Sequence, residues 1–199
     1  MNRLARRALS RFAKASDPGA IRRLMVAQSH AERAVTAHQL WRRRAPAPII
    51  RAAIEIAWGS DGSVVRGVFG NAMERAIREA QFPVDHIPPR VTVWRGGHGD
   101  FTFVADGISW TMNRDVACWY CCRPVDAPID EVAQFGSRGR GAYFVVRREV
   151  ERSSITMHLN HHGQDEVVIF ARELPGAATI DGTPSDWLEG FRRYERGRA

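Results

Sequence analysis

The chain has 199 residues, 44% of them hydrophobic, which suffices for one large globular domain or a domain with an appendage. No apolar run reaches the roughly 20 residues that a transmembrane helix needs, so a membrane span is not expected. The three cysteines lie within one short segment, residues 118–122. This clustering argues against a disulfide framework and favours a reducing compartment, so we expect a cytoplasmic protein.

The net charge of +7 is concentrated in the first quarter of the chain. Residues 1–50 contain ten arginines and one lysine against two acidic residues, a net charge of +9, whereas residues 51–199 carry a net charge of −2. Such an asymmetry is typical of proteins that bind a polyanion, nucleic acid first and an anionic membrane surface second. A solvated, arginine-rich helix face explains the same counts equally well.

Residues 1–85 are predicted to form an Arg-rich helical region. Asp17 precedes a proline, which is typical of a helix start, and apolar residues then recur at helical spacing as far as Arg44. A second helix is expected to end at Gly59, and a third is expected to begin at Asp61. Nothing in this region predicts a catalytic residue.

Residues 86–199 are predicted to form a second domain of the α+β class, because the apolar pattern changes from helical to extended after residue 85. The glycine-rich segment 96–99 is expected to form a turn, and residues 124–140 a long connection. Helices are expected to begin at Asn113 and Thr183. The expected strands are residues 91–95, 107–111, 142–146, 154–159 and a strand that Glu166 opens.

Neither the cysteines nor the histidines predict a metal site. Residues 118–122 read Cys-x-x-Cys-Cys without a second cysteine pair, so burial of the thiols on one face of a helix is expected. His158, His161 and His162 match no strong zinc spacing. They are expected in a loop, where they either present an acceptor molecule or are simply exposed to solvent.

Polar residues stand at the entrance of the strand that Glu166 opens. In an extended chain alternate side chains share a face, so Gln164 and Glu166 are expected together and Asp165 on the other side. Arg95 and Ser109 lie in two earlier predicted strands. The planar fork of an arginine suits a diphosphate, a serine can orient a carboxylate, and a glutamate can hold a sugar hydroxyl while positive charge builds on the ring. Together these residues predict cleavage of a glycosidic bond in a nucleotide sugar.

Residues 86–199 resemble the arginine–serine–glutamate class of ADP-ribosyltransferases, which includes cholera-toxin-like and Rho-modifying exoenzymes. The order, spacing and strand context of three motifs carry the resemblance. The matching segments are Val-Trp-Arg-Gly-Gly at 93–97 for the arginine motif, Ser-Trp-Thr at 109–111 for the Ser-Thr-Ser motif, and Gln-Asp-Glu-Val-Val at 164–168 for the glutamate motif.

The resemblance implies a split, bent β-sandwich that binds NAD as a co-substrate, preceded here by the helical region. Arg95 would contact the phosphates or the adenosine ribose, and the backbone of Gly96 would lie near the nicotinamide amide. Ser109 would support Glu166, the catalytic carboxylate, and Thr111 would keep a hydroxyl in the motif on the NAD-binding side.

The resemblance further places an aromatic residue and a cation over the nicotinamide end of NAD. Phe135 and Arg138, in the long connection, are the candidates, with Tyr143 as an alternative aromatic residue. Two positions depart from the family pattern. Trp110 stands where the motif has a threonine, and Gln164 stands where arginine-modifying members have a glutamate. Glutamine there is typical of members that modify asparagine or, in pierisin-like enzymes, nucleic-acid bases.

The expected activity is therefore NAD-dependent mono-ADP-ribosyl transfer, a pentosyl transfer in which Gln164 places the acceptor. The acceptor is expected to be RNA or DNA ahead of protein, and not arginine. The biological role would be that of a toxin, a phage-encoded modifier or a defence effector, and an antitoxin would be a partner of a toxin. Three alternatives stay open: transfer to a protein side chain, NAD hydrolysis alone, and a non-enzymatic binding module with a vestigial NAD cleft.

Overall fold

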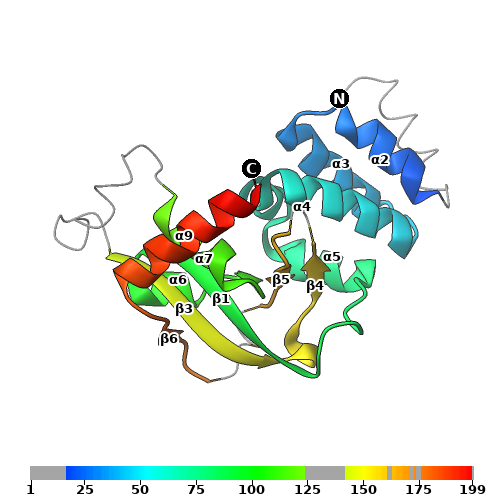
Figure 1. Ribbon diagram of the computed structural model, residues 1–199. Helices are drawn as coiled ribbons and strands as arrows, with labels where there is room; N and C mark the ends of the chain where they lie inside the picture. The colour runs from blue at the N-terminus through cyan, green and yellow to red at the C-terminus, as the bar shows by residue number, and fades with distance from the viewer. Residues whose placement is uncertain (1–16, 124–141, 161–162, 171–172, 174–175, 199) are drawn as a thin grey trace. The chain divides into compact units, whose positions relative to one another are not determined.

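The computed structural model describes residues 17–123, 142–160, 163–170, 173 and 176–198. The chain divides into two compact units, Met1–Pro83 and Val84–Ala199, whose elements are labelled in Figure 1. The domain boundary predicted from the sequence, between residues 85 and 86, lies next to this division. Within the described ranges, no helix is both long and apolar enough to cross a membrane.

The described part of the first unit consists of helices. Asp17 caps the first of them as predicted, since its carboxylate accepts a hydrogen bond from the Gly19 amide at 2.8 Å. Apolar side chains from all four α-helices are fully buried and form the core of this unit. The elements are α2 (Pro18–Val26), α3 (His30–Arg42), α4 (Ala47–Phe69), the short 3-10 helix η1 (Gly70–Ala72) and α5 (Met73–Ala80).

The first helix is shorter than predicted, because a second helix start interrupts it. Ser29 and Glu32 form a capping box: the Ser29 amide donates to Glu32 Oε2 at 2.9 Å, and the Ser29 hydroxyl accepts from the Glu32 amide at 3.4 Å. This pair begins α3. The prediction of one continuous helix as far as Arg44 was wrong, although the Ser-x-x-Glu spacing that corrects it is visible in the sequence.

The second and third predicted helices are joined in α4. The helix continues through Gly59 instead of ending there, and its backbone leaves helical geometry only at Asp61, with φ −167° and ψ 98°. The Asp61 carboxylate accepts a hydrogen bond from the Ser63 amide at 2.9 Å. Asp61 therefore caps the second half of α4, as predicted. The two halves of the helix are joined by a kink at this residue and not by a loop.

The second unit combines helices with an antiparallel sheet, which confirms the predicted α+β class. The sheet has six described strands in the order β4-β5-β2-β1-β3-β6. The finer expectation of a split β-sandwich stays a prediction. The elements are β1 (Arg90–Gly99), α6 (Phe101–Ala105), β2 (Ser109–Thr111), α7 (Arg114–Cys122), β3 (Ala142–Glu151), η3 (Arg152–Ser154), β4 (Met157–Leu159), β5 (Glu166–Val168), β6 (Thr179–Ile180) and α9 (Pro184–Arg198).

The two long strands β1 and β3 run side by side and form the centre of this unit (Figure 1). Their pairing extends from Arg90 opposite Glu151 to Gly99 opposite Ala142. The segment 96–99 therefore belongs to a strand, and the predicted turn is wrong. The chain turns only at Asp100, whose carboxylate caps α6 by accepting from the Phe103 amide at 2.7 Å.

Helix α7 crosses β1 so closely at Gly96 that a side chain does not fit there. A Cβ atom at this position would lie 1.8 Å from the carbonyl oxygen of Ala117 in α7. The three cysteines of α7 are buried as predicted, in a cluster that includes Trp187 and Phe191 of α9. Burial raises the pKa of the Cys118 thiol to about 12. Gly96 thus sets the distance between the sheet and its covering helix.

We predict that Gly96→Ala lowers the free energy of unfolding by about 3 kcal/mol, because the added methyl group forces α7 away from β1. Gly97→Ala is the matched control, since its Cβ would meet only Val104, at 3.4 Å. We expect that variant to change stability by less than about 1 kcal/mol. Urea unfolding of both variants measures the difference, and equal losses would contradict the account of Gly96.

Candidate active site around Glu166

The candidate site is built on the pairing of two three-residue strands. Ser109 to Thr111 of β2 pair antiparallel with Glu166 to Val168 of β5, with Thr111 opposite Glu166. Alternate residues of a strand share a face, so Ser109 and Glu166 lie on the same side of the sheet. The Ser109 hydroxyl donates a hydrogen bond to Glu166 Oε1. The structure therefore brings together two of the residues that the sequence selected.

Arg95 joins this pair through the backbone. Its guanidinium passes over Gly107, where a Cβ atom would lie 2.2 Å from the Arg95 Cζ atom, and Nη1 donates to the carbonyl oxygen of Ser109. Only glycine leaves room for this path. Arg95 thus holds the start of β2 in place. This structural role is separate from the contact with a phosphate that the sequence predicts.

Thr111 lies on the same face of the sheet as Ser109 and stands opposite Glu166. It is 5% exposed, and its hydroxyl donates to the carbonyl oxygen of Gln164 at 2.5 Å while it accepts from the Asn113 amide at 3.0 Å. Asn113 in turn caps α7, as predicted. Both of these hydrogen bonds go to the protein backbone, so Thr111 positions the turn before Glu166, and the contact with NAD that the resemblance implies stays a prediction.

Gln164 lies in a turn before β5. Gly163 and Asp165, on either side of it, both have left-handed backbone conformations, with φ of 71° and 42°. The chain is therefore not extended at this point, and the expected alternation of Gln164 and Glu166 on one strand face was wrong. The Met112 amide donates to the Asp165 carbonyl oxygen at 2.9 Å and so ties the turn to the end of β2. A left-handed backbone is uncommon for residues other than glycine, although aspartate adopts it more readily than most and is frequent in turns.

Two histidines and an aspartate form a row next to this turn. His158 Nδ1 lies 2.7 Å from Nε2 of His86, and His158 Nε2 lies 3.5 Å from a carboxylate oxygen of Asp165. His158 belongs to strand β4, within the predicted strand 154–159, and its side chain is 10% exposed, so the separate expectation of a loop histidine was wrong. His161 and His162 lie outside the described residues. No sequence signal connected His86 with this row.

Tyr120 of α7 is a residue near Glu166 that no sequence motif marked. Burial and then the charge of Glu166 raise the pKa of its phenol group, although the residue as a whole is 46% exposed. An exposed aromatic ring within electrostatic reach of the carboxylate can cover part of a bound ligand. The sequence placed Tyr120 in the helix that Asn113 begins, but it gave no sign that this helix brings Tyr120 near Glu166.

The other predicted site residues lie in β1, β2 and β3 or outside the described residues. Gly96 lies in β1 under α7, so the packing of α7 is already a sufficient reason for a glycine there. Tyr143 is half-buried in β3, with its ring centre 6.0 Å from that of His98. Phe135 and Arg138 lie outside the described residues. Trp110, the departure from the motif, is 1% exposed in the core and donates from its indole to the Gly107 carbonyl oxygen at 2.7 Å.

No family model, curated protein or solved structure matches the chain. In the part of the chain that the structure describes, no group of three or more His, Cys, Asp or Glu side chains is arranged to hold a metal ion.

A basic pocket of about 530 Å³ lies within the helical unit. The Arg75 guanidinium lies 5.9 Å from the ring centre of Trp41, and both side chains donate to the Glu79 carboxylate, at 2.8 and 2.6 Å. Arg42 and Arg44 line the same pocket, and Arg44 has a left-handed backbone with φ 54°. Proteins that bind single-stranded nucleic acid combine basic side chains with aromatic rings on which bases stack.

The row of His158 predicts a loss of stability in acid. Burial and then the charge of His86 lower the pKa of His158, whereas Asp165 acts in the opposite direction. A histidine held neutral in the folded state contributes its full stability above the unfolded pKa of about 6.5. This contribution is lost as the pH falls below that value towards the lower folded pKa.

We expect His158→Gln to make the free energy of unfolding less dependent on pH between 7.5 and 5.5, by at most about 1.4 kcal/mol per pH unit. Urea unfolding at the two pH values, followed by circular dichroism, measures the change. His98→Gln, at an exposed position of β1, is the control. If both variants kept the wild-type pH dependence, the claim that burial keeps His158 neutral in the folded state would be refuted.

Proposed function

We propose that the chain is an NAD-dependent mono-ADP-ribosyltransferase. The observation that carries the proposal is the hydrogen bond from Ser109 to Glu166 across the paired strands β2 and β5. Arg95, bonded to the Ser109 carbonyl oxygen, adds the third residue of the family motif to the same place. Three residues that lie up to 71 positions apart in the sequence are thus neighbours.

In the proposed reaction the bond between the nicotinamide nitrogen and C1′ of the ribose breaks. Nicotinamide leaves with the bonding electron pair, and the ribose carbon becomes electron-deficient. The Glu166 carboxylate would hydrogen-bond a hydroxyl of this ribose and stabilise the developing positive charge, a contribution of about 3 kcal/mol for one oriented group. Ser109 would fix the carboxylate in the required orientation, because a preoriented group needs no rearrangement during the reaction.

The acceptor then forms a bond to C1′ and releases its proton to solvent. We propose a nucleic-acid base as the acceptor. The neutral amide of Gln164, two residues before Glu166, supports this choice, because it can hydrogen-bond a base but cannot attract a guanidinium as a carboxylate does. The basic pocket around Trp41 also supports it, since stacking and phosphate contacts would bind the strand that carries the base.

Such a modification of nucleic acid would suit a toxin, a phage-encoded modifier or a defence effector acting in the cytoplasm. A toxin would require an antitoxin that covers Glu166 in the cell that produces it. The split β-sandwich of the class is part of the same proposal, and the six described strands form a single antiparallel sheet.

We predict that Glu166→Gln lowers the rate of nicotinamide release from NAD by about 100-fold or more, because the neutral amide no longer stabilises the cationic ribose. Glu151→Gln is the matched control, since Glu151 is an exposed carboxylate at the end of β3. Release of nicotinamide from NAD, measured by chromatography with equal amounts of each variant, tests the prediction. A wild-type rate in Glu166→Gln would refute the catalytic assignment.

The same assay with adenylate-labelled NAD and a mixed cell extract identifies the acceptor. The proposal expects label in polymer that nuclease releases and protease does not. Arg42→Gln, in the basic pocket, should reduce this labelling while nicotinamide release stays unchanged, and Arg66→Gln, exposed elsewhere on the helical unit, should affect neither. Label that only protease releases would overturn the nucleic-acid acceptor, and label found only in free ADP-ribose would indicate hydrolysis.

A further inference from the structure

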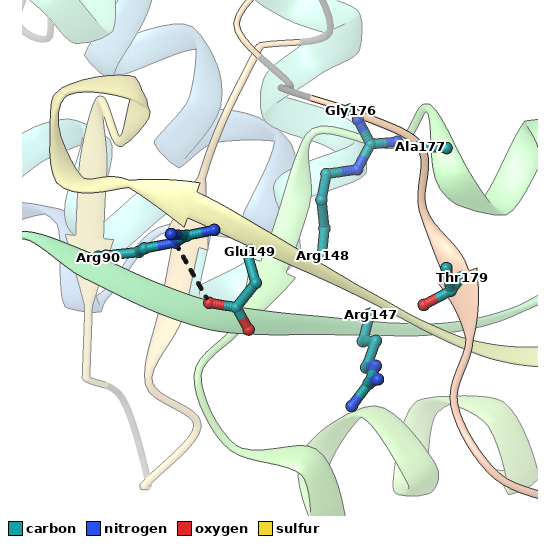
Figure 2. Close-up of a pocket in the computed structure, with 7 residues that line it drawn as sticks. All are labelled: Arg90, Arg147, Arg148, Glu149, Gly176, Ala177 and Thr179. Carbon is teal, nitrogen blue, oxygen red and sulfur yellow. Dashed lines mark ion pairs between the residues drawn. The ribbon is translucent and has the colours of Figure 1, made fainter.

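A second pocket, of about 420 Å³, lies at the edge of the sheet in the second unit and shares no residue with the Glu166 site. Figure 2 shows it between β3, the start of β1 and the segment before β6. The pairing of β6 with β3 covers only Val146 and Arg147, so the pocket lies where this segment runs beyond the paired residues. Residues that line it include Arg90, Arg147, Arg148, Glu149, Gly176 and Thr179.

Arg148 is the unusual member of this pocket, because it is a buried cation. It is 8% exposed, on the core side of β3, and its guanidinium lies 5.6 Å from the ring centre of Trp110. Nη2 reaches one backbone acceptor, the Ala105 carbonyl oxygen, at 3.5 Å, and Nε has no hydrogen-bond partner within the described part of the chain. In the described part of the chain no ion pair involves this guanidinium, and the charge of Asp106 offsets the cost of its burial only in part, so an anionic ligand would stabilise it.

The other charges of the pocket are also favourable to an anion. Arg90 Nε lies 3.8 Å from Glu149, and Arg147 Nε lies 3.9 Å from Asp181, distances at which ion pairs are weak. The three arginines and the single carboxylate that line the pocket give it a net charge of +2. A field of this sign attracts anions from solution.

The directions of the side chains show which arginine faces the pocket. Figure 2 shows the guanidinium of Arg148 next to Gly176 and Ala177, whereas Arg147 leaves β3 on the opposite side. This is the alternation expected of neighbouring residues in a strand. Arg148 is therefore the direct ligand, and Arg147 and Arg90 contribute through their charge. Among the described residues, no atom lies within 4 Å of the position of a Cβ at Gly176, so this side of the pocket is open to a ligand.

We propose that this pocket binds a phosphate group, with Arg148 as its anchor and the Thr179 hydroxyl at its rim. A phosphate dianion matches the net charge of the pocket, which a single carboxylate would only half neutralise, and the planar fork of a guanidinium bonds two phosphate oxygens at once. The phosphate belongs either to a small ion or ester, or to the backbone of a nucleic acid.

The test measures the thermal unfolding temperature of the whole chain as inorganic phosphate is added, with chloride adjusted to keep the ionic strength constant. A ligand that binds only the folded state stabilises it by RT ln(1 + c/Kd), where c is the free ligand concentration, so this temperature rises with the concentration of the ligand. We expect phosphate to stabilise the wild type and to leave Arg148→Met unchanged, because methionine fills the buried space without a charge. Arg192→Gln, at an exposed position of α9, should respond like the wild type.

Thr179→Glu provides a second variant in case Arg148→Met does not fold. This exposed residue lines the pocket, and a carboxylate there would repel phosphate without disturbing the core. Its response to phosphate should be lost as well. The pocket assignment is overturned if Thr179→Glu or a folded Arg148→Met is stabilised as much as the wild type.

An oligonucleotide without terminal phosphates, added in place of inorganic phosphate, distinguishes the two sources. Stabilisation by inorganic phosphate alone indicates a small ion or ester, and stronger stabilisation by the oligonucleotide indicates a nucleic-acid backbone. Either result supports the pocket if Thr179→Glu abolishes it. The absence of any effect of both ligands on the wild type would refute the proposal, and neither arm involves NAD or Glu166.

Discussion

The candidate site depends on the register between β2 and β5, two strands of three residues each. Ser109 and Glu166 share a face only because Thr111 stands opposite Glu166. A slip of one residue would send the two side chains to opposite faces of the sheet. Two further contacts hold this register: the Thr111 hydroxyl bonds the Gln164 carbonyl oxygen, and the Met112 amide bonds that of Asp165. The turn before Glu166 is thereby fixed to the strand that carries Ser109.

Two glycines allow the close contacts around this site. Gly107 leaves the space that the Arg95 guanidinium occupies on its way to the Ser109 carbonyl oxygen, and Gly96 lets α7 lie directly on β1. Because Asn113, two residues after Thr111, caps α7, the position of this helix and that of β2 are linked. Close packing is therefore a sufficient reason for glycine at positions 96 and 107, independently of any role in ligand binding.

Local patterns made several features predictable from the sequence. Asp17, Asp61 and Asn113 cap helices, and caps depend on neighbouring residues alone. The strand around Glu166 follows from its β-branched residues, and the proximity of Arg95, Ser109 and Glu166 was expected only through the resemblance to a family. The class of the fold was predicted for the same local reasons.

Features that arise from contacts between distant elements were not predictable. The glycines at 96–99 have the composition of a turn, but β3 pairs with them and keeps them extended. His158 lies in a segment that was predicted as a strand, but its pairing with β5 and its contact with His86 had no local signal. Arg148 has an apolar environment that no local pattern indicates, because Trp110 belongs to a strand that is not adjacent to β3.

The most direct measurement of the central claim is a crystal structure of the chain with a non-cleavable NAD analogue. The account predicts that the nicotinamide ribose lies against the Glu166 carboxylate, with a hydroxyl of that ribose within hydrogen-bonding distance of it and Ser109 still bonded to Glu166. An analogue bound elsewhere on the molecule, with Glu166 remote from the ribose, would contradict the account.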